Sequence, residues 1–236
     1  MVFIAKNAHI ITEQHLSEDG RDTKIGTTKQ GNGPAYRDKY DRNGVTAGDH
    51  PDLIDSEYLI DLYEELHGRH TPTVLCEGAQ GFGLDIDWGD SPFVTSSHCT
   101  TAGALLNGIP PQSVRRIYGV AKAYDTYVGS KTFQGHEDIF NYIQGVGKEF
   151  GATTGRPRQC NWVDVQRLQR SVNINGVRSL VFNKMDILRT LGKWALRDGE
   201  DIIEFESEEA FIMYLIRYFP GVEIYFSDSP HGFDEN

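Results

Sequence analysis

The segment between Glu77 and Gly103, EGAQGFGLDIDWGDSPFVTSSHCTTAG, concentrates glycines, carboxylates, one amide and a run of hydroxyls. It follows three apolar residues, Val74-Leu75-Cys76, a pattern typical of a binding loop that leaves a buried strand. The segment has no lysine and therefore differs from a Walker-type phosphate loop, which ends in Gly-Lys-Ser/Thr. A ligand here would be held by Gln80, by backbone N–H groups and by the hydroxyls of residues 95–97. The same composition also suits a glycine-rich surface turn.

Two further segments carry side chains suited to anions. Residues 26–36, GTTKQGNGPAY, contain glycines that let backbone N–H groups approach an anion closely. Arg156-Pro157-Arg158 places two guanidinium groups on a loop that proline stiffens, which lowers the cost of presenting both to carboxylate or phosphate oxygens. The alternatives, a flexible loop and a solubilising Arg-Pro-Arg, stay open for the residues taken alone.

The tetrapeptide Asn183-Lys184-Met185-Asp186 has the NKxD pattern of guanine-nucleotide sites. The Asp186 carboxylate can accept hydrogen bonds from the N1–H and the 2-amino group of guanine, which adenine lacks, while the Lys184 stem can lie along the base. The pattern follows an expected strand, and ligands of α/β sheets bind at the carboxyl ends of strands. These residues therefore predict a guanine-nucleotide site.

Composition limits the class of protein. The 236 residues carry a net charge of −11, which argues against a long nucleic-acid groove. No apolar run is long enough to span a bilayer, and the N-terminal MVFIAKNAHIITEQ does not have the pattern of a signal peptide. Three widely spaced cysteines predict free thiols and a reducing, cytoplasmic location.

Hydrophobic periodicity predicts alternating strands and helices, and hence an α/β fold. Expected strands cover residues 2–11, 73–76, 178–182 and 222–226, and a loop is expected at 227–230. Expected helices cover residues 56–68, with Ser56 as its N-cap, 100–108, 137–146, 162–172 and 208–218.

Taken together, these segments resemble the adenylosuccinate synthetase family. The motifs, in the family's order, are GTTxxGxGPAYxDK at 26–39, EGAQGxxLDIDxGxxPxVTSS at 77–97, TTAG at 100–103, KAYxTxVG at 122–129, EFGATTGRxR at 149–158 and NKMDIL at 183–188. The family joins aspartate to inosine monophosphate (IMP) with GTP. The resemblance implies a P-loop-NTPase-like α/β fold with a central, mostly parallel sheet and flanking helices, incomplete at the N-terminus, and a single domain over residues 1–236.

The resemblance also implies roles for individual residues. GTP would phosphorylate the purine 6-oxygen before the aspartate amine displaces the phosphate, and Gln80 would hydrogen-bond at the reacting position. Contacts to the purine monophosphate would come from Thr28, Gln80, Thr95 and Arg156, with Arg42 reaching the neighbouring subunit of a homodimer. Contacts to aspartate would come from Thr153, Thr154 and Arg156. Contacts to GTP would come from Arg158, Lys184, Met185, Asp186, Ser227, Asp228 and Ser229. Mg²⁺ is expected with GTP.

The sequence departs from the family pattern in four places, one of which is Lys29-Gln30 where the family usually has Gly-Arg in the first loop. It contains no GDEGKG loop, which in the family binds GTP phosphates and magnesium and carries the catalytic aspartate, nor the catalytic histidine that follows it. We therefore expect a fragment, one half of a split enzyme with a separate N-terminal polypeptide, or a degenerate paralogue, and no turnover by this chain alone. The spacer between Arg42 and Glu77 is short, as in the compact archaeal and viral branches. Ser227-Asp228-Ser229-Pro230 stands where the family usually has a Gly-Pro pair.

Two alternatives to the IMP ligase follow from these departures. One is a phage-type synthetase that joins aspartate to deoxyguanylate (dGMP) for 2-aminoadenine synthesis, often with ATP as phosphate donor. The other is a nucleotide-binding subunit without catalytic activity.

Overall fold

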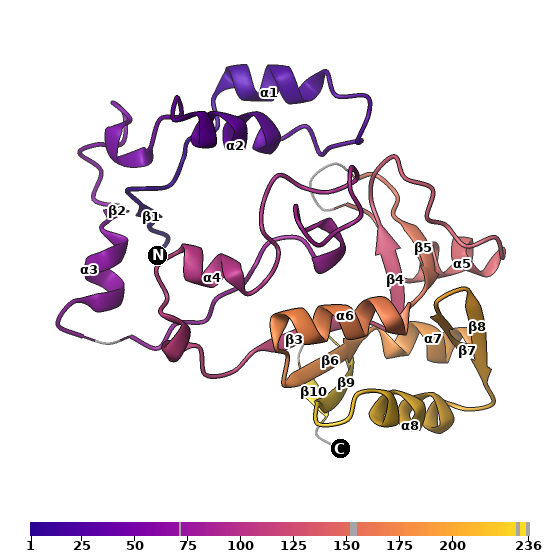
Figure 1. Cartoon of the computed structure of the whole chain (residues 1–236). Coiled ribbons are helices and arrows are strands. Elements are labelled where there is room, and N and C mark those ends of the chain that lie inside the picture. The colour runs from indigo at the N-terminus through magenta and orange to yellow at the C-terminus, as the bar shows by residue number, and fades with distance from the viewer. Residues whose placement is uncertain (71, 152–154, 230–231, 235–236) are drawn as a thin grey trace. The chain divides into compact units, whose positions relative to one another are not determined.

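The computed structural model describes residues 1–70, 72–151, 155–229 and 232–234 (Figure 1). Its contacts divide the chain into two compact units, Met1–Val114 and Arg115–Asn236, which are described separately below. The expectation of one domain over the whole chain stays a prediction. None of the helices in the described residues is both long and apolar enough to cross a membrane.

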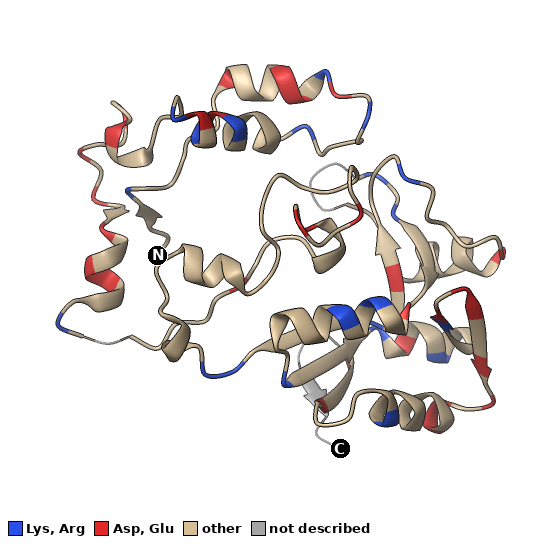
Figure 2. Cartoon of the chain, in the orientation of Figure 1, with Lys and Arg blue, Asp and Glu red and all other residues tan. Residues whose placement is uncertain are grey.

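The first unit consists mostly of short helices and loops. Its strands β1 (Ile4–Ala5) and β2 (Leu59–Ile60) pair in parallel. The α-helices are α1 (Glu13–Gly20), α2 (Asn32–Asp41), α3 (Leu62–His67) and α4 (Ala102–Leu106), and the 3₁₀ turns are Ala47–Asp49, Phe82–Leu84 and Pro111–Ser113. Charges of opposite sign join α1 to α2 (Figure 2). His15 Nε2 lies 3.0 Å from Asp38, and Arg37 lies 2.7 Å from Glu18.

The second unit is built on a mostly parallel sheet with the strand order β10-β9-β6-β3. Strands β3 (Tyr118–Lys122), β6 (Ser179–Asn183) and β9 (Glu223–Ser229) are parallel, and β10 (Gly232–Asp234) is antiparallel to β9. Two antiparallel pairs complete the strands: β4 (Tyr124–Tyr127) with β5 (Gln159–Trp162), and β7 (Trp194–Asp198) with β8 (Asp201–Phe205). The helices are α5 (Ile139–Val146), α6 (Val165–Asn175), α7 (Met185–Leu191) and α8 (Glu208–Tyr218).

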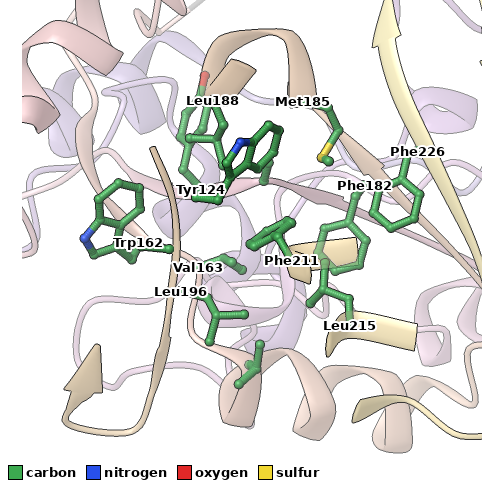
Figure 3. Close-up of a cluster of buried hydrophobic side chains, with 14 of the residues drawn as sticks. Tyr124, Trp162, Val163, Phe182, Met185, Leu188, Leu196, Phe211, Leu215 and Phe226 are labelled. Carbon is green, nitrogen blue, oxygen red and sulfur yellow. The ribbon is translucent and has the colours of Figure 1, made fainter. Parts of the chain in front are cut away.

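One hydrophobic core holds the second unit together (Figure 3). Phe182 on β6 and Phe226 on β9 stack with ring centroids 5.8 Å apart, and Phe211 and Leu215 bring the apolar face of α8 into the same cluster. Helix α7 contributes Leu188, which is fully buried. Because this core fixes β6, α7 and β9 relative to one another, it also fixes the polar residues at their ends. The predicted α/β fold with a mostly parallel sheet and flanking helices is confirmed.

Several predicted elements have different bounds. The helix expected at 56–68 is α3, which begins only at Leu62 because Asp61 caps it, while residues 59–60 pair with β1. The helix expected at 162–172 begins at Val165, capped by Asp164, and Trp162 belongs to β5. Of the strand expected at 2–11, only residues 4–5 form a strand.

Two further expectations about strands were wrong. Residues 73–76 form no strand, and Leu75 is 90% exposed, because the described residues offer this segment no partner to pair with. Of the loop expected at 227–230, residues 227–229 are instead the end of β9, which continues through Ser229 because β10 pairs with it, and Pro230 lies outside the described residues.

Candidate functional site

Two carboxylates hold the backbone of the loop before α2, which contains Thr28. Asp22 accepts hydrogen bonds from the N–H groups of Gly26 at 2.9 Å and Ile25 at 3.2 Å. Asp19 is buried and accepts from the Gly31 N–H at 2.8 Å. Burial alone would raise the pKa of Asp22. The hydrogen bonds from backbone N–H groups together lower it by more, so that the pKa of Asp22 lies below its ordinary value. Both ends of the Thr28 loop are therefore anchored, while Thr28 itself is exposed.

Asp85 organises the loop between Glu77 and Gly103. Its side chain is fully buried, and one oxygen accepts from the N–H groups of Asp87 and Trp88, each at 3.0 Å. The other oxygen accepts from the Cys99 N–H at 2.6 Å. Burial raises the pKa of Asp85, yet these three donors outweigh burial and keep the pKa below its usual range. One carboxylate thus connects residues 14 positions apart in the chain.

The other predicted side chains of the first unit lie around these two loops. Gln80 is exposed and has a left-handed backbone with φ 61°, and the Cys99 thiol donates to its Oε1 over 4.0 Å. Thr95 is half-buried, with its Oγ1 3.4 Å from the Ser97 hydroxyl. A Cβ placed on Gly33, in the first turn of α2, would lie 3.4 Å from the Ser96 hydroxyl. The structure therefore brings the hydroxyl run of residues 95–97 to the start of α2, directly after the Thr28 loop.

Arg42 ends α2 in a left-handed conformation, with φ 66°. Its side chain is exposed and forms no ion pair within the described residues. An exposed, unpaired guanidinium is available to a partner, and contact with a neighbouring subunit stays a prediction.

Asp85, Asp87 and His98 form a group of possible metal ligands whose ligand atoms lie within 4.8 Å of one another. Both Asp85 oxygens already accept backbone N–H groups, and the His98 Nδ1 lies 3.5 Å from Asp87. Mg²⁺ prefers oxygen ligands in near-ideal octahedral geometry. This group does not fit Mg²⁺, and no reaction step is assigned to it.

In the second unit, the strand register aligns the polar ends of neighbouring parallel strands. Lys122, the last residue of β3, is opposite Asn183, the last residue of β6. Phe182 is opposite Phe226, so that Ser227 and Asp228 continue β9 beside the end of β6. The carboxyl edge of the sheet therefore carries a cluster of polar residues at the position where α/β sheets bind ligands.

Glu149 connects this edge with the loop that contains Arg156 and Arg158. It is 1% exposed, and its carboxylate accepts from the Lys122 Nζ at 2.7 Å, the Tyr124 hydroxyl at 2.7 Å and the Arg158 Nη1 at 2.9 Å. Lys122 also donates to the Thr126 hydroxyl at 3.0 Å. Both oxygens of the buried Glu149 carboxylate thus have partners, as a buried charge requires.

The electrostatics of this network follow from burial and pairing. Burial is the largest influence on Lys122 and lowers its pKa, although the Glu149 carboxylate partly counteracts the effect. Burial also raises the pKa of Glu149, but the hydrogen bonds from Lys122 and Tyr124 lower it more strongly. The pKa of Glu149 therefore lies below its usual range. Burial and the nearby carboxylate raise the pKa of Tyr124, which is therefore a neutral donor.

The NKMD residues lie at the junction of β6 and α7. Lys184 has φ 64°, and its Nζ donates to the Gly147 carbonyl, just after α5, at 3.2 Å. Asp186 is half-buried in the first turn of α7, and within the described residues its carboxylate accepts no hydrogen bond. Met185 is 1% exposed and belongs to the core, so that only its backbone could reach a ligand.

The remaining predicted side chains of this unit differ in burial and in the partners that they already have. Arg156 is half-buried and its carbonyl accepts from the Gly151 N–H at 2.8 Å, whereas Thr153 and Thr154 lie outside the described residues. Ser227 is buried, and Asp228 forms an ion pair with Arg189 at 2.9 Å. Ser229 pairs through its backbone with Gly232. The roles of these residues stay predictions.

Sequence reasoning missed the carboxylates that hold the loops: Asp19, Asp22, Asp85 and Glu149. It also gave no role to Lys122. Lys122 could have been found, because it is a charged residue at the end of a strand that neighbours the NKxD strand. The partners of Asp85 and Glu149 come from folding, and no spacing in the sequence predicts them.

The chain is similar in sequence and in fold to known proteins. The family model described as adenylosuccinate synthetase matches residues 1–71 and 50–196. Curated adenylosuccinate synthetases from Brugia malayi, Chlorobaculum tepidum and Phocaeicola vulgatus are 37%, 36% and 33% identical over 80%, 88% and 96% of this chain. The solved structure of fully ligated adenylosuccinate synthetase from Plasmodium falciparum superposes with a TM-score of 0.74 and 28% identity, covering 87% of this chain and 62% of that one.

The mostly parallel sheet with polar residues at its carboxyl edge defines an α/β protein of the type that binds ligands at strand ends. The matched ranges then identify the family: the chain belongs to the adenylosuccinate synthetase family. The succinoaminodeoxyadenylate synthetase of cyanophage S-2L, solved with dGMP and with dATP as an energy donor, shares the fold, with a TM-score of 0.64 at 20% identity over 92% of this chain and 72% of that one.

The chain spans 55%, 61% and 64% of the lengths of the three curated relatives. The match to the Phocaeicola relative extends over 286 residues, more than the 236 residues of this chain, so that the relative has internal segments which this chain lacks. The short spacer between Arg42 and Glu77 is one place for such a difference.

Proposed function

We propose that this chain carries ligand-binding parts of an adenylosuccinate synthetase-type ligase, which forms a C–N bond between IMP and L-aspartate at the expense of GTP. The observation that carries the proposal is the NKMD tetrapeptide at the carboxyl end of β6, within a chain whose family model matches through residue 196. Asp186 there has an unengaged carboxylate on the first turn of a helix, where it can accept from guanine.

The proposed contacts divide between the units. In the first unit, Thr28, Gln80 and Thr95 would bind the purine monophosphate, and the carboxylates of Asp22 and Asp85 hold their loops in place. In the second unit, Arg156 would bind the aspartate carboxylate, and Arg158, Lys184 and Asp186 would bind GTP. Mg²⁺ would accompany the nucleotide phosphates.

The chemistry suits residues that position ligands and stabilise charge. Phosphoryl transfer depends mainly on positioning and electrostatic stabilisation, and arginine forks and hydroxyls supply both without a covalent nucleophile. The 236 residues contain no GDEGKG loop, and we propose that turnover requires that loop. The residues named above would bind their ligands without it.

Calorimetry with the purified chain tests the proposal and decides between the purines. IMP is expected to bind more tightly than dGMP, and Thr95→Val is expected to weaken binding because it removes the hydroxyl at nearly constant volume. Thr190→Val is the matched control, because the Thr190 hydroxyl donates to the Asp186 carbonyl and is not assigned to the purine. Tighter binding of dGMP would favour the phage-type reaction, and binding of neither purine would overturn the purine site. Formation of adenylosuccinate by the chain alone would contradict the requirement for the loop.

A further inference from the structure

Glu149 is a buried carboxylate that faces more positive than negative charge. Lys122 and Arg158 bind it directly, at 2.7 and 2.9 Å. Lys184 is a third cation, close enough to lower the pKa of Lys122 by repulsion between the two positive charges. The Asp186 carboxylate is also near, since it raises the pKa of Tyr124 together with Glu149. Two carboxylates against three cations leave one positive charge in excess, which favours an anion at the carboxyl edge of the sheet.

The same residue closes the stem of the loop that contains Arg156. The Arg158 N–H donates to the Glu149 carbonyl at 2.9 Å, and Phe150 and Pro157 form the next, antiparallel bridge. The Gly151 N–H then donates to the Arg156 carbonyl at 2.8 Å. Glu149 thus joins the two sides of the stem twice, through its backbone and through its side chain.

Arg158 contacts Glu149 with only part of its guanidinium group. Its Nη1 donates to the carboxylate, while 31% of the side chain is exposed. The planar guanidinium has five N–H donors in fixed directions, so that a bond on one edge determines where the other edge points. A carboxylate behind the arginine therefore orients the donors that face a ligand.

We propose that Glu149 is a positioning residue of the GTP site, which fixes Arg158 from the buried side so that its free N–H groups face the nucleotide. This inference rests on the proposed function. Glu149 itself touches no ligand, since its carboxylate is enclosed by Lys122, Tyr124 and Arg158.

A double-mutant cycle on GTP affinity tests this role. Glu149→Gln is expected to weaken GTP binding about tenfold, the size of a lost charge-assisted hydrogen bond. Arg158→Ala is expected to weaken it by at least as much, and adding Glu149→Gln to that variant is expected to cause no further loss, because the two residues act as one unit. Glu206→Gln is the control, an exposed carboxylate that forms no ion pair within the described residues.

The variant Lys122→Met/Glu149→Gln separates positioning from folding. Glu149→Gln alone leaves two partly buried cations without their carboxylate and can unfold the chain, whereas the double variant removes one of those cations as well. A positioning role predicts that the double variant folds and still binds GTP about tenfold more weakly than the wild type. Recovery of wild-type affinity in this variant, or additive losses in the Arg158 cycle, would overturn the inference.

The outcomes also separate this inference from the proposed function. A wild-type chain that binds no GTP overturns the proposed function, and the role of Glu149 falls with it. A wild-type chain that binds GTP while Glu149→Gln binds it equally well overturns only the role of Glu149.

Discussion

Replacing Asp85 with asparagine should open the loop between Glu77 and Gly103. The asparagine has the same shape but one oxygen fewer, and the carboxylate accepts the N–H groups of Asp87 and Trp88 on one oxygen and that of Cys99 on the other. Whichever way the amide turns, its NH₂ group faces at least one of these donors. At least one charge-assisted hydrogen bond to a buried group is lost, and the remaining bonds lose the negative charge, which together cost about 2 kcal/mol.

Hydrogen exchange measured by mass spectrometry checks this value locally. A cost of about 2 kcal/mol corresponds to roughly 30-fold faster exchange of the amides that Asp85 holds. Asp87→Asn is the control, because the Asp87 side chain is 66% exposed and its ion pair with His98 spans 3.5 Å. It should cost less than about 0.5 kcal/mol. Equal exchange in the two variants would refute the idea that Asp85 fastens the loop.

The pH dependence of the same experiment has a definite sign. The pKa of Asp85 is lower in the folded chain than the value of 3.8 expected when it is exposed. Its contribution to stability is therefore present above pH 3.8 and is lost as the pH falls through the folded value. The difference in exchange between the wild type and Asp85→Asn should shrink below pH 3.8, and a constant difference would contradict the assignment.

Three further substitutions, the first with a matched control, test the structure through denaturant unfolding. Gly31→Ala should cost about 2 kcal/mol or more, because Gly31 has φ 77° and an added Cβ would lie 2.7 Å from Ile11, whereas Gly221→Ala, with φ 79° and open space, should cost only the backbone strain. Equal costs would contradict the steric argument. Ser207→Ala should cost about 1 kcal/mol, since its hydroxyl accepts the Ala210 N–H at 3.2 Å as the N-cap of α8, and no change would refute the cap. Leu188→Ala should cost about 2–5 kcal/mol because Leu188 is 0% exposed, and a cost below 1 kcal/mol, on the order expected at the surface, would place it outside the core.

The parts of the fold that the sequence predicted well are those set by local pattern. Strand β6 agrees with its prediction because it is a continuous apolar run. Helix α8 agrees because its apolar residues recur with helical spacing directly after Ser207, which is its N-cap. The NKMD residues were placed correctly at the end of β6 for the same reason.

The parts that could not be predicted depend on partners distant in the chain. Ser56 and Asp61 are both good N-caps, and the pairing of residues 59–60 with β1 decides that the helix starts after Asp61. Residues 73–76, of which Val74, Leu75 and Cys76 are apolar, have the composition of a strand, yet a strand needs a partner as well as propensity. Lys122 and Glu149 are 27 residues apart, and only the folded sheet brings them together.

The preference of the chain for GTP over ATP, and the dependence of that preference on Asp186, is the sharpest test of the proposed guanine-nucleotide site. Calorimetry should show that GTP binds and that ATP binds much more weakly, since only guanine offers two donors to the Asp186 carboxylate. Asp186→Asn should reduce GTP affinity by about tenfold to a hundredfold and leave ATP binding unchanged, while Asp201→Asn, at the exposed first residue of β8, should change neither. Equal affinity for GTP and ATP in the wild type, or unaltered GTP binding by Asp186→Asn, would contradict a guanine-nucleotide site at Asp186.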